Sequence, residues 1–201
     1  MCSGEISLSP YPDPQLSDLP SALRRYGRLP TSAEQQMITS LFQSAINFAK
    51  VRIYPRKLLP FQFHHTAITP FGLIYFPPVH YQPDFTQADF RYQHWFMHEI
   101  VHVWQHQMGM NVVWRGLFSF CAPYHYDLQQ NRLLSDFGME QQACIIADYF
   151  VLTVHGFAAW LSVTRQHNPT SRLNKDYWAD LYQFTLMLFL TKPMIAKILF
   201  P

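Results

Sequence analysis

Apolar residues recur at helical spacing in the segment that follows Thr31. Thr31 and Glu34 stand three residues apart, as in a capping box at the start of a helix. Beyond them, apolar side chains repeat every three or four positions as far as Phe48. This periodicity is typical of an amphipathic helix, and it predicts one over residues 32–48.

Two short alternating segments come next along the chain. Residues 51–54 and 73–76 are rich in branched and aromatic side chains and are bounded by prolines and a glycine. This composition predicts two short strands separated by a loop, with a turn near Gly72. We expect the strands to pair as a small antiparallel sheet.

A further helical pattern covers residues 87–108, where bulky apolar side chains occur on several sides. A helix that is apolar almost all round belongs at the centre of a domain. Asp84 or Thr86 is a candidate cap for its start, and Gly109 is a candidate end. Further helices are predicted over 139–155 and 178–190, with a polar loop over 121–136.

The central helical pattern contains His98-Glu99-Ile100-Val101-His102, which reads H-E-x-x-H. Residues four apart lie on one face of a helix, so both histidines can reach one metal ion. Glu99 lies beside the first ligand, where it can deprotonate a water molecule that the metal activates. His94 and His106 extend the same stripe, but only His98 is followed by a glutamate, and we expect the other two to be neighbours of the site or to face solvent.

A catalytic zinc ion usually has three protein ligands and one open position. Of the four glutamates in the chain, Glu140 is the one that follows the motif, and it lies on a predicted helix. A glutamate brought back by a second helix completes a His2Glu set, so Glu140 is our third-ligand candidate. The alternatives left open are His125, Asp136, Asp148 and His155.

Two supporting roles also have candidates. A ligand histidine usually gives its second N–H to a carboxylate or a carbonyl, and Asp148 is the candidate, ahead of Asp127 and Asp136. The oxyanion formed during amide hydrolysis needs a donor. Tyr124, His125 and Tyr126 lie in the polar loop between the two metal helices, and we expect one of them, or His155, to supply that donor.

Composition limits the remaining possibilities. The chain has 201 residues, a net charge of +2 and only 14% charged residues, which gives no case for nucleic-acid binding and leaves room for an apolar docking surface. The three cysteines are widely spaced and indicate free thiols rather than a disulfide framework.

Residues 1–30 hold five prolines and are expected to form an arm outside a single domain over 31–201. The N-terminal residues lack the pattern of a signal peptide and the chain lacks a membrane-spanning run, so we expect synthesis in the cytoplasm.

Three segments carry a resemblance to known proteins: Thr69-Pro70-Phe71-Gly72 with the following strand, the region around the H-E-x-x-H motif, and Glu140-Gln141-Gln142-Ala143. Together they resemble the gluzincin group of zincins, and more narrowly the small bacterial metallopeptidases labelled Vgr-related or Rhs-element-associated. The similarity spans residues 29–150. In gluzincins an aspartate often stands four residues after the ligand glutamate, whereas this chain has Cys144.

The resemblance implies an α+β, zincin-like, mostly helical fold with Zn2+ bound by His98, His102 and Glu140, and with Glu99 as the base. It also implies a link to type VI secretion and export by a specialised route. The expected activity is hydrolysis of peptide bonds in a protein or in cell-wall peptides. A strand over 73–76 at the edge of the cleft would pair with an extended substrate. The alternative function is a non-catalytic accessory, adaptor or immunity-type partner of a secretion apparatus, with a vestigial or structural metal site.

Overall fold

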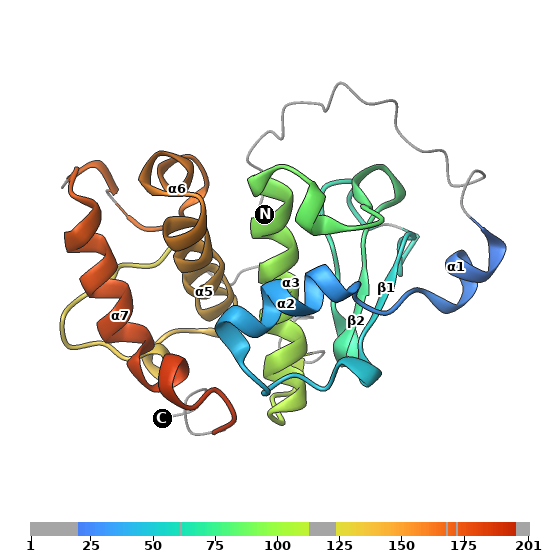
Figure 1. Ribbon diagram of the computed structural model, residues 1–201, viewed down its shortest axis with the longest axis horizontal. Coiled ribbons are helices and arrows are strands. Elements are labelled where there is room, and N and C mark those ends of the chain that lie inside the picture. Colours follow the sequence, from blue (N-terminus) through green and yellow to red (C-terminus); the bar gives the residue numbers. More distant parts are fainter. Residues whose placement is uncertain (1–19, 61, 113–123, 168, 172, 196–201) are drawn as a thin grey trace.

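The structure is a computed structural model that describes residues 20–60, 62–112, 124–167, 169–171 and 173–195. The central element is helix α3, Phe90–Gln107. In Figure 1 the strands lie on one side of α3 and helices α5, α6 and α7 lie on the other. The expected α+β class with mostly helical content is confirmed. The Pro-rich residues 1–19 lie outside the described residues, and the division into an arm and a domain stays a prediction.

Helix α1, Ser21–Tyr26, and helix α2, Ser32–Phe42, open the described part of the chain. The predicted capping box is present, because Glu34 N–H donates to Thr31 Oγ1 and Thr31 N–H donates to Glu34 Oε2. The fully buried Glu34 carboxylate also forms a two-pronged ion pair with Arg28, at 2.6 and 2.7 Å. It also accepts a second backbone hydrogen bond, from Phe85 N–H, which joins the start of α2 to the segment before α3.

Helix α2 ends six positions before the predicted limit. Gln43 adopts a left-handed conformation with φ 50° and stops the helix, and Asn47 then caps a short 3-10 turn over Phe48–Lys50. The Asn47 side chain accepts a hydrogen bond from Ala49 N–H, and such local bonds compete with a helix, whereas apolar periodicity alone extended the prediction to residue 48.

The sheet consists of β1, Arg52–Tyr54, and β2, Leu73–Tyr75, and the two strands are parallel. The prediction of an antiparallel sheet is therefore wrong. Residues 55–72 are long enough for the crossover that parallel strands require, whereas a tight hairpin would have forced the antiparallel arrangement. Antiparallel pairing occurs only as isolated bridges in the described residues, between Arg28 and Ile53 and between Ile68 and Tyr75.

Helix α3 begins at Phe90 because Asp89 accepts a hydrogen bond from Arg91 N–H. Asp84 caps the preceding 3-10 turn, Phe85–Gln87. The predicted end is confirmed, since Gly109 follows with φ 94°. Twelve residues of α3 are buried, which agrees with a central helix. Trp104 is fully buried among rings from α2 and α7, with Phe42 5.9 Å and Phe189 5.1 Å away between ring centroids.

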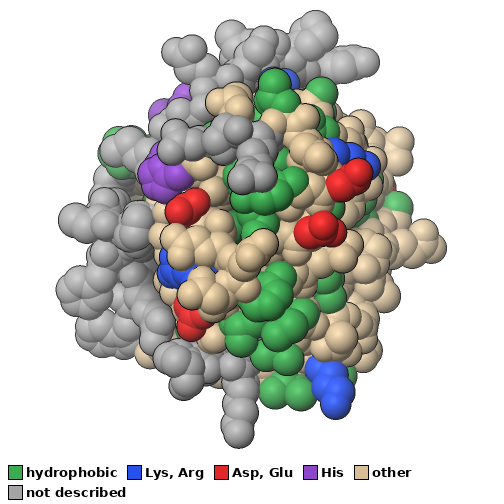
Figure 2. All heavy atoms as spheres, turned by 90° about the vertical axis from the view of Figure 1, so that its left-hand side faces the viewer, with side chains coloured by type: hydrophobic (Ala, Val, Ile, Leu, Met, Phe, Trp, Pro, Cys, Tyr) green, Lys and Arg blue, Asp and Glu red, His purple; other side chains and the backbone are tan. Residues whose placement is uncertain are grey.

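Helix α5, Met139–Val154, packs against α3, and α6, Phe157–Val163, follows after Gly156. Helix α7, Lys175–Thr191, closes the described part of the chain. One face of α7 is buried, but Phe184, Met187 and Leu188 remain 39%, 41% and 47% exposed. Figure 2 shows apolar side chains gathered along this side of the molecule. Within the described ranges, no helix combines the length and the apolar character needed to cross a bilayer.

Candidate metal centre

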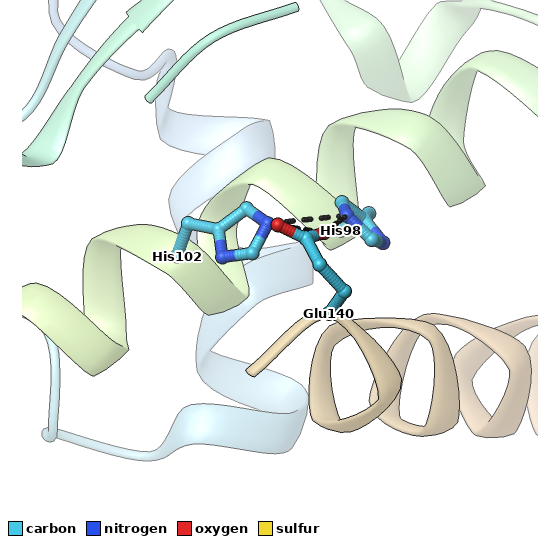
Figure 3. A group of neighbouring side chains, drawn as sticks. All are labelled: His98, His102 and Glu140. Carbon is cyan, nitrogen blue, oxygen red and sulfur yellow. Dashed lines mark hydrogen bonds and ion pairs between the residues drawn. The ribbon is translucent and has the colours of Figure 1, made fainter. Parts of the chain in front are cut away.

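Three side chains predicted as metal ligands converge between α3 and α5. His98 and His102 lie one turn apart on α3, and Glu140 lies in the first turn of α5. All three are buried, with 5 to 6% of their surface exposed. Figure 3 shows the two imidazoles and the carboxylate directed toward one another. The helix N-terminus also favours a negative charge at the position of Glu140.

The donor atoms form a nearly equilateral triangle. His98 Nε2 and His102 Nε2 are 3.2 Å apart, and each lies 3.3 Å from Glu140 Oε2. An ion about 2.0 Å from each of three ligand atoms, at tetrahedral angles, requires separations of about 3.3 Å between those atoms. The residues present therefore fit a metal ion, and together they form a group that could hold one.

Hydrogen bonds to the other ring nitrogens direct both Nε2 atoms toward the centre. His102 Nδ1 lies 2.8 Å from Gln105 Oε1, which accepts its proton, so Nε2 keeps the lone pair that binds metal. The Gln105 amide donates in turn to Met139 O and Gln142 Oε1, at 3.0 Å each. Gln105 is fully buried, and this chain of bonds connects His102 with the start of α5, where Glu140 lies.

The cysteine at the position where gluzincins often carry aspartate is also placed beside a ligand. Cys144 Sγ is 3.8 Å from His98 Nδ1, and Cys144 is fully buried. A thiol is a weak hydrogen-bond acceptor, so it supports the orientation of His98 less strongly than a carboxylate would.

The electrostatics of the triangle favour bound positive charge. Burial by itself would lower the pKa of His102, but the Glu140 carboxylate, with smaller contributions from Glu99 and Gln105, raises that pKa to about 9. Burial would raise the pKa of Glu140, yet the charges and hydrogen bonds of His102 and His98 hold it well below its usual range. A site that stabilises a proton this strongly also stabilises a metal cation.

The predicted base, Glu99, has a buried partner that the sequence analysis did not identify. Thr69 Oγ1 donates to Glu99 Oε2 at 2.5 Å, and both residues are 5% exposed. Thr69 belongs to the first arm of a hairpin that leads into β2. The contact orients the Glu99 carboxylate through one of its two oxygens.

The three candidate oxyanion donors occupy three different environments. The Tyr124 ring stacks over His98 at 6.3 Å between centroids and is half-buried. His125 is exposed and lies 3.2 Å from Arg165 O. Tyr126 is buried beside Asp148 and Tyr182. The structure thus brings Tyr124 to the metal centre and places the other two elsewhere. His155, a further candidate, lies 2.9 Å from Gln93 Oε1.

Asp148 lies in a separate buried network. Its carboxylate contacts His94 Nε2 at 2.6 Å and accepts from Tyr126 OH at 2.5 Å and from Thr164 Oγ1 at 2.8 Å. Asp148 is eight residues beyond Glu140, or about 12 Å further along the helix axis, which is too far to reach the same histidines. Asp148 therefore contacts His94 rather than a ligand histidine, which is not the role that we predicted for it. The residue that bonds to the second nitrogen of His102 is Gln105.

The backbone of β2 is paired on both sides near its end. Ile68 and Tyr75 exchange both backbone hydrogen bonds, at 2.9 and 3.2 Å, on the side opposite β1. The hypothesis that the 73–76 strand offers its own edge to a substrate therefore needs correction. The segment that lies alongside Glu99 is the hairpin arm over 67–69.

Comparison with known proteins connects this geometry to a family. No family model matches the chain. The solved effector domain of Pseudomonas aeruginosa VgrG2b is 31% identical, aligns with 69% of this chain and 82% of that domain, and superposes with a TM-score of 0.60. This chain belongs to the VgrG2b effector-domain family. The type VI secretion system spike protein VgrG2b itself is 31% identical over 132 residues, which is 62% of this chain but 13% of the spike protein. The Vgr-related part of the resemblance is therefore confirmed.

Proposed function

We propose that this chain is a zinc-dependent hydrolase of peptide bonds that acts in connection with a type VI secretion system. The observation that carries the chemical proposal is the triangle of His98, His102 and Glu140 donor atoms, with edges of 3.2 to 3.3 Å, beside a buried glutamate. The proposed link to secretion rests on membership of the VgrG2b effector-domain family. On this proposal the chain binds a protein of the secretion apparatus and is exported by that apparatus.

The residues of the chain divide the work of amide hydrolysis among them. When bound, a zinc ion would lower the pKa of water toward neutrality and polarise the substrate carbonyl. Glu99 takes a proton from the attacking water and passes it to the leaving amine. Thr69 holds the Glu99 carboxylate in one orientation through its 2.5 Å hydrogen bond. Tyr124, stacked on His98, is the candidate donor to the oxyanion.

The test compares zinc-loaded wild type with Glu99→Gln on a mixture of peptides, with cleavage followed by mass spectrometry. Glutamine keeps the shape of the side chain but cannot take up the proton, so cleavage should fall by at least about a hundredfold. Zinc content should stay at the wild-type level because Glu99 is not a ligand. His94→Gln, a substitution on the same helix outside the triangle, serves as the control for zinc content. Equal cleavage by wild type and Glu99→Gln would contradict the mechanism and favour the accessory-protein alternative.

A further inference from the structure

The loop that connects β1 with the hairpin arm before β2 exposes large apolar side chains. Leu58 and Leu59 are 39% and 40% exposed, and Phe63 is 59% exposed. We call residues 56–60 and 62–66 the apolar loop, which joins the strands that Figure 1 shows on one side of α3. Single exposed apolar residues are common on protein surfaces, whereas several on one short loop form a patch that marks a contact site.

A buried glutamine holds the apolar loop in shape. Gln62 is 5% exposed, and its Oε1 accepts a hydrogen bond from Leu58 N–H at 2.8 Å. Its Nε2 donates to Thr66 O at 2.6 Å and to Tyr75 O, in β2, at 3.4 Å. The two ends of the loop are thus tied to each other and to the sheet. Because the amide occupies the inner side of the loop, the fold itself presents the apolar side chains to solvent.

Basic side chains directly precede the first exposed leucine. Among the described residues, neither Arg56 nor Lys57 forms an ion pair. The Arg56 guanidinium lies over the rings of Tyr54 and Tyr75, 5.2 and 5.7 Å from their centroids, which positions its charge at the base of the loop. Residues 35–83 contain lysines and arginines but no aspartate or glutamate. The apolar loop therefore combines exposed apolar surface with positive charge that no acid in this stretch of the sequence offsets.

An anionic bilayer surface matches both of these properties. Its headgroups attract basic side chains that lie beside the membrane, and its interface accepts apolar and aromatic side chains that enter only a short way. The interface with another protein usually has few lysines in its core and requires more area than a single loop supplies. The chemistry of the loop therefore favours lipid over a protein partner.

We propose that the apolar loop docks this chain on a bilayer that contains anionic phospholipid. The three exposed apolar side chains enter the interface between headgroups and acyl chains, and Arg56 and Lys57 contact the phosphates. Thr69, which bonds to Glu99, follows the loop by three residues, or at most about 10 Å of chain. Docking thus holds the candidate metal centre near the bilayer surface, although no residue of the loop belongs to that centre.

Flotation with lipid vesicles tests the docking without relying on cleavage. The full chain is mixed with vesicles of phosphatidylcholine alone or with vesicles of equal parts phosphatidylcholine and phosphatidylglycerol. The chain should float with the mixed vesicles and stay largely unbound with the phosphatidylcholine vesicles. Zinc-free protein and the Glu99→Gln variant should bind the mixed vesicles as well as the zinc-loaded wild type does, so that docking and hydrolysis are tested separately.

Two combined variants separate the apolar part of the loop from its basic part. Leu58→Ser with Leu59→Ser and Phe63→Ser should weaken partition into the mixed vesicles at least about tenfold. Arg56→Gln with Lys57→Gln should weaken it about 25-fold, since each basic residue near an anionic surface contributes about fivefold. These side chains are largely exposed, so both variants should melt within about 2 °C of wild type.

Matched controls change the same kinds of residue elsewhere on the surface. Phe184→Ser with Leu188→Ser removes exposed apolar side chains from α7. Lys175→Gln with Lys192→Gln lowers the net charge by the same amount as the double variant of the loop, at exposed positions at the two ends of α7. Both controls should bind the mixed vesicles within about twofold of wild type.

Each contrary outcome overturns a stated part of the proposal. Absence of binding to the mixed vesicles, or equal binding to both kinds of vesicle, would overturn docking on anionic lipid. A control variant that loses as much binding as the corresponding loop variant would overturn the assignment of docking to the apolar loop. Binding of the chain to polyglutamate but not to vesicles would overturn the lipid surface as the partner and indicate an acidic protein instead.

Discussion

Gln105 is the residue through which the metal centre can be perturbed without touching a ligand. Substitution by methionine keeps the length and apolar stem of the side chain and removes the amide. His102 Nδ1 then loses the acceptor at 2.8 Å, and Met139 O and Gln142 Oε1 lose a donor at 3.0 Å. The imidazole is free to rotate or to change tautomer, and either change takes Nε2 away from the metal.

The expected loss in zinc affinity is about 10- to 100-fold, the usual effect of removing the group that orients a ligand histidine. Because buried polar groups are left unpaired, the free energy of unfolding should fall by about 1–3 kcal/mol for each group that finds no new partner. Zinc affinity is measured by competition with a chromogenic chelator at fixed pH, and stability by urea denaturation.

A matched control lies two residues further along the same helix. Gln107 bonds to the backbone of Asn47 at the surface, outside the His102 network. Gln107→Met should therefore leave zinc affinity unchanged. The reasoning is refuted if Gln105→Met binds zinc as tightly as wild type, or if both variants lose affinity equally.

Four further predictions rest on individual contacts. Zinc must displace the proton that His102 holds below its pKa of about 9, so the apparent zinc affinity should rise by up to about tenfold per pH unit between pH 6 and 8. The affinity is measured by calorimetric titration, and an affinity independent of pH would count against the site. For the metal-free protein the same raised pKa stabilises the fold fully below pH 6.5, and this contribution should disappear as the pH rises through about 9 in thermal denaturation scans. Thr69→Val removes a hydrogen bond to the Glu99 carboxylate and should lower kcat about 10- to 100-fold, with zinc affinity retained. Thr69→Ser keeps the hydroxyl and should retain most of the wild-type rate. A serine variant as slow as the valine variant would indicate that Thr69 acts through packing instead. Glu34→Gln breaks the buried ion pair with Arg28 and should lower the free energy of unfolding by about 3–5 kcal/mol, as measured by urea denaturation. A loss below about 1 kcal/mol would mean that the pair is not buried as described.

The elements that hold the metal centre were predictable because their signals are local. Spacing of four residues places His98 and His102 on one helix face, and bulky neighbours on several sides identify that helix as central. Glu140 stood out because it is the one glutamate after the motif, on a strongly periodic segment. The structure places all three donor atoms within 3.3 Å of one another.

The features that were not predicted depend on relations between distant segments. Strand direction follows from how residues 55–72 cross over, and the alternation of side chains within each strand carries no information about it. Glutamines rarely stand out as partners of metal ligands in a sequence, so Gln105 was passed over in favour of a carboxylate. Phe71 and Gly72, which lie in the turn between the paired residues Ile68 and Tyr75, both have positive φ, but they lack the Asn-Gly signature of a type I′ turn, so only the backbone angles identify it.

The central claim is that His98, His102 and Glu140 together bind one zinc ion, and anomalous diffraction at the zinc absorption edge from crystals of the purified chain tests it most directly. We predict a single strong peak about 2.0–2.2 Å from Nε2 of each histidine and from a carboxylate oxygen of Glu140. A zinc peak elsewhere, or zinc-soaked crystals with no peak between these three side chains, would contradict the claim.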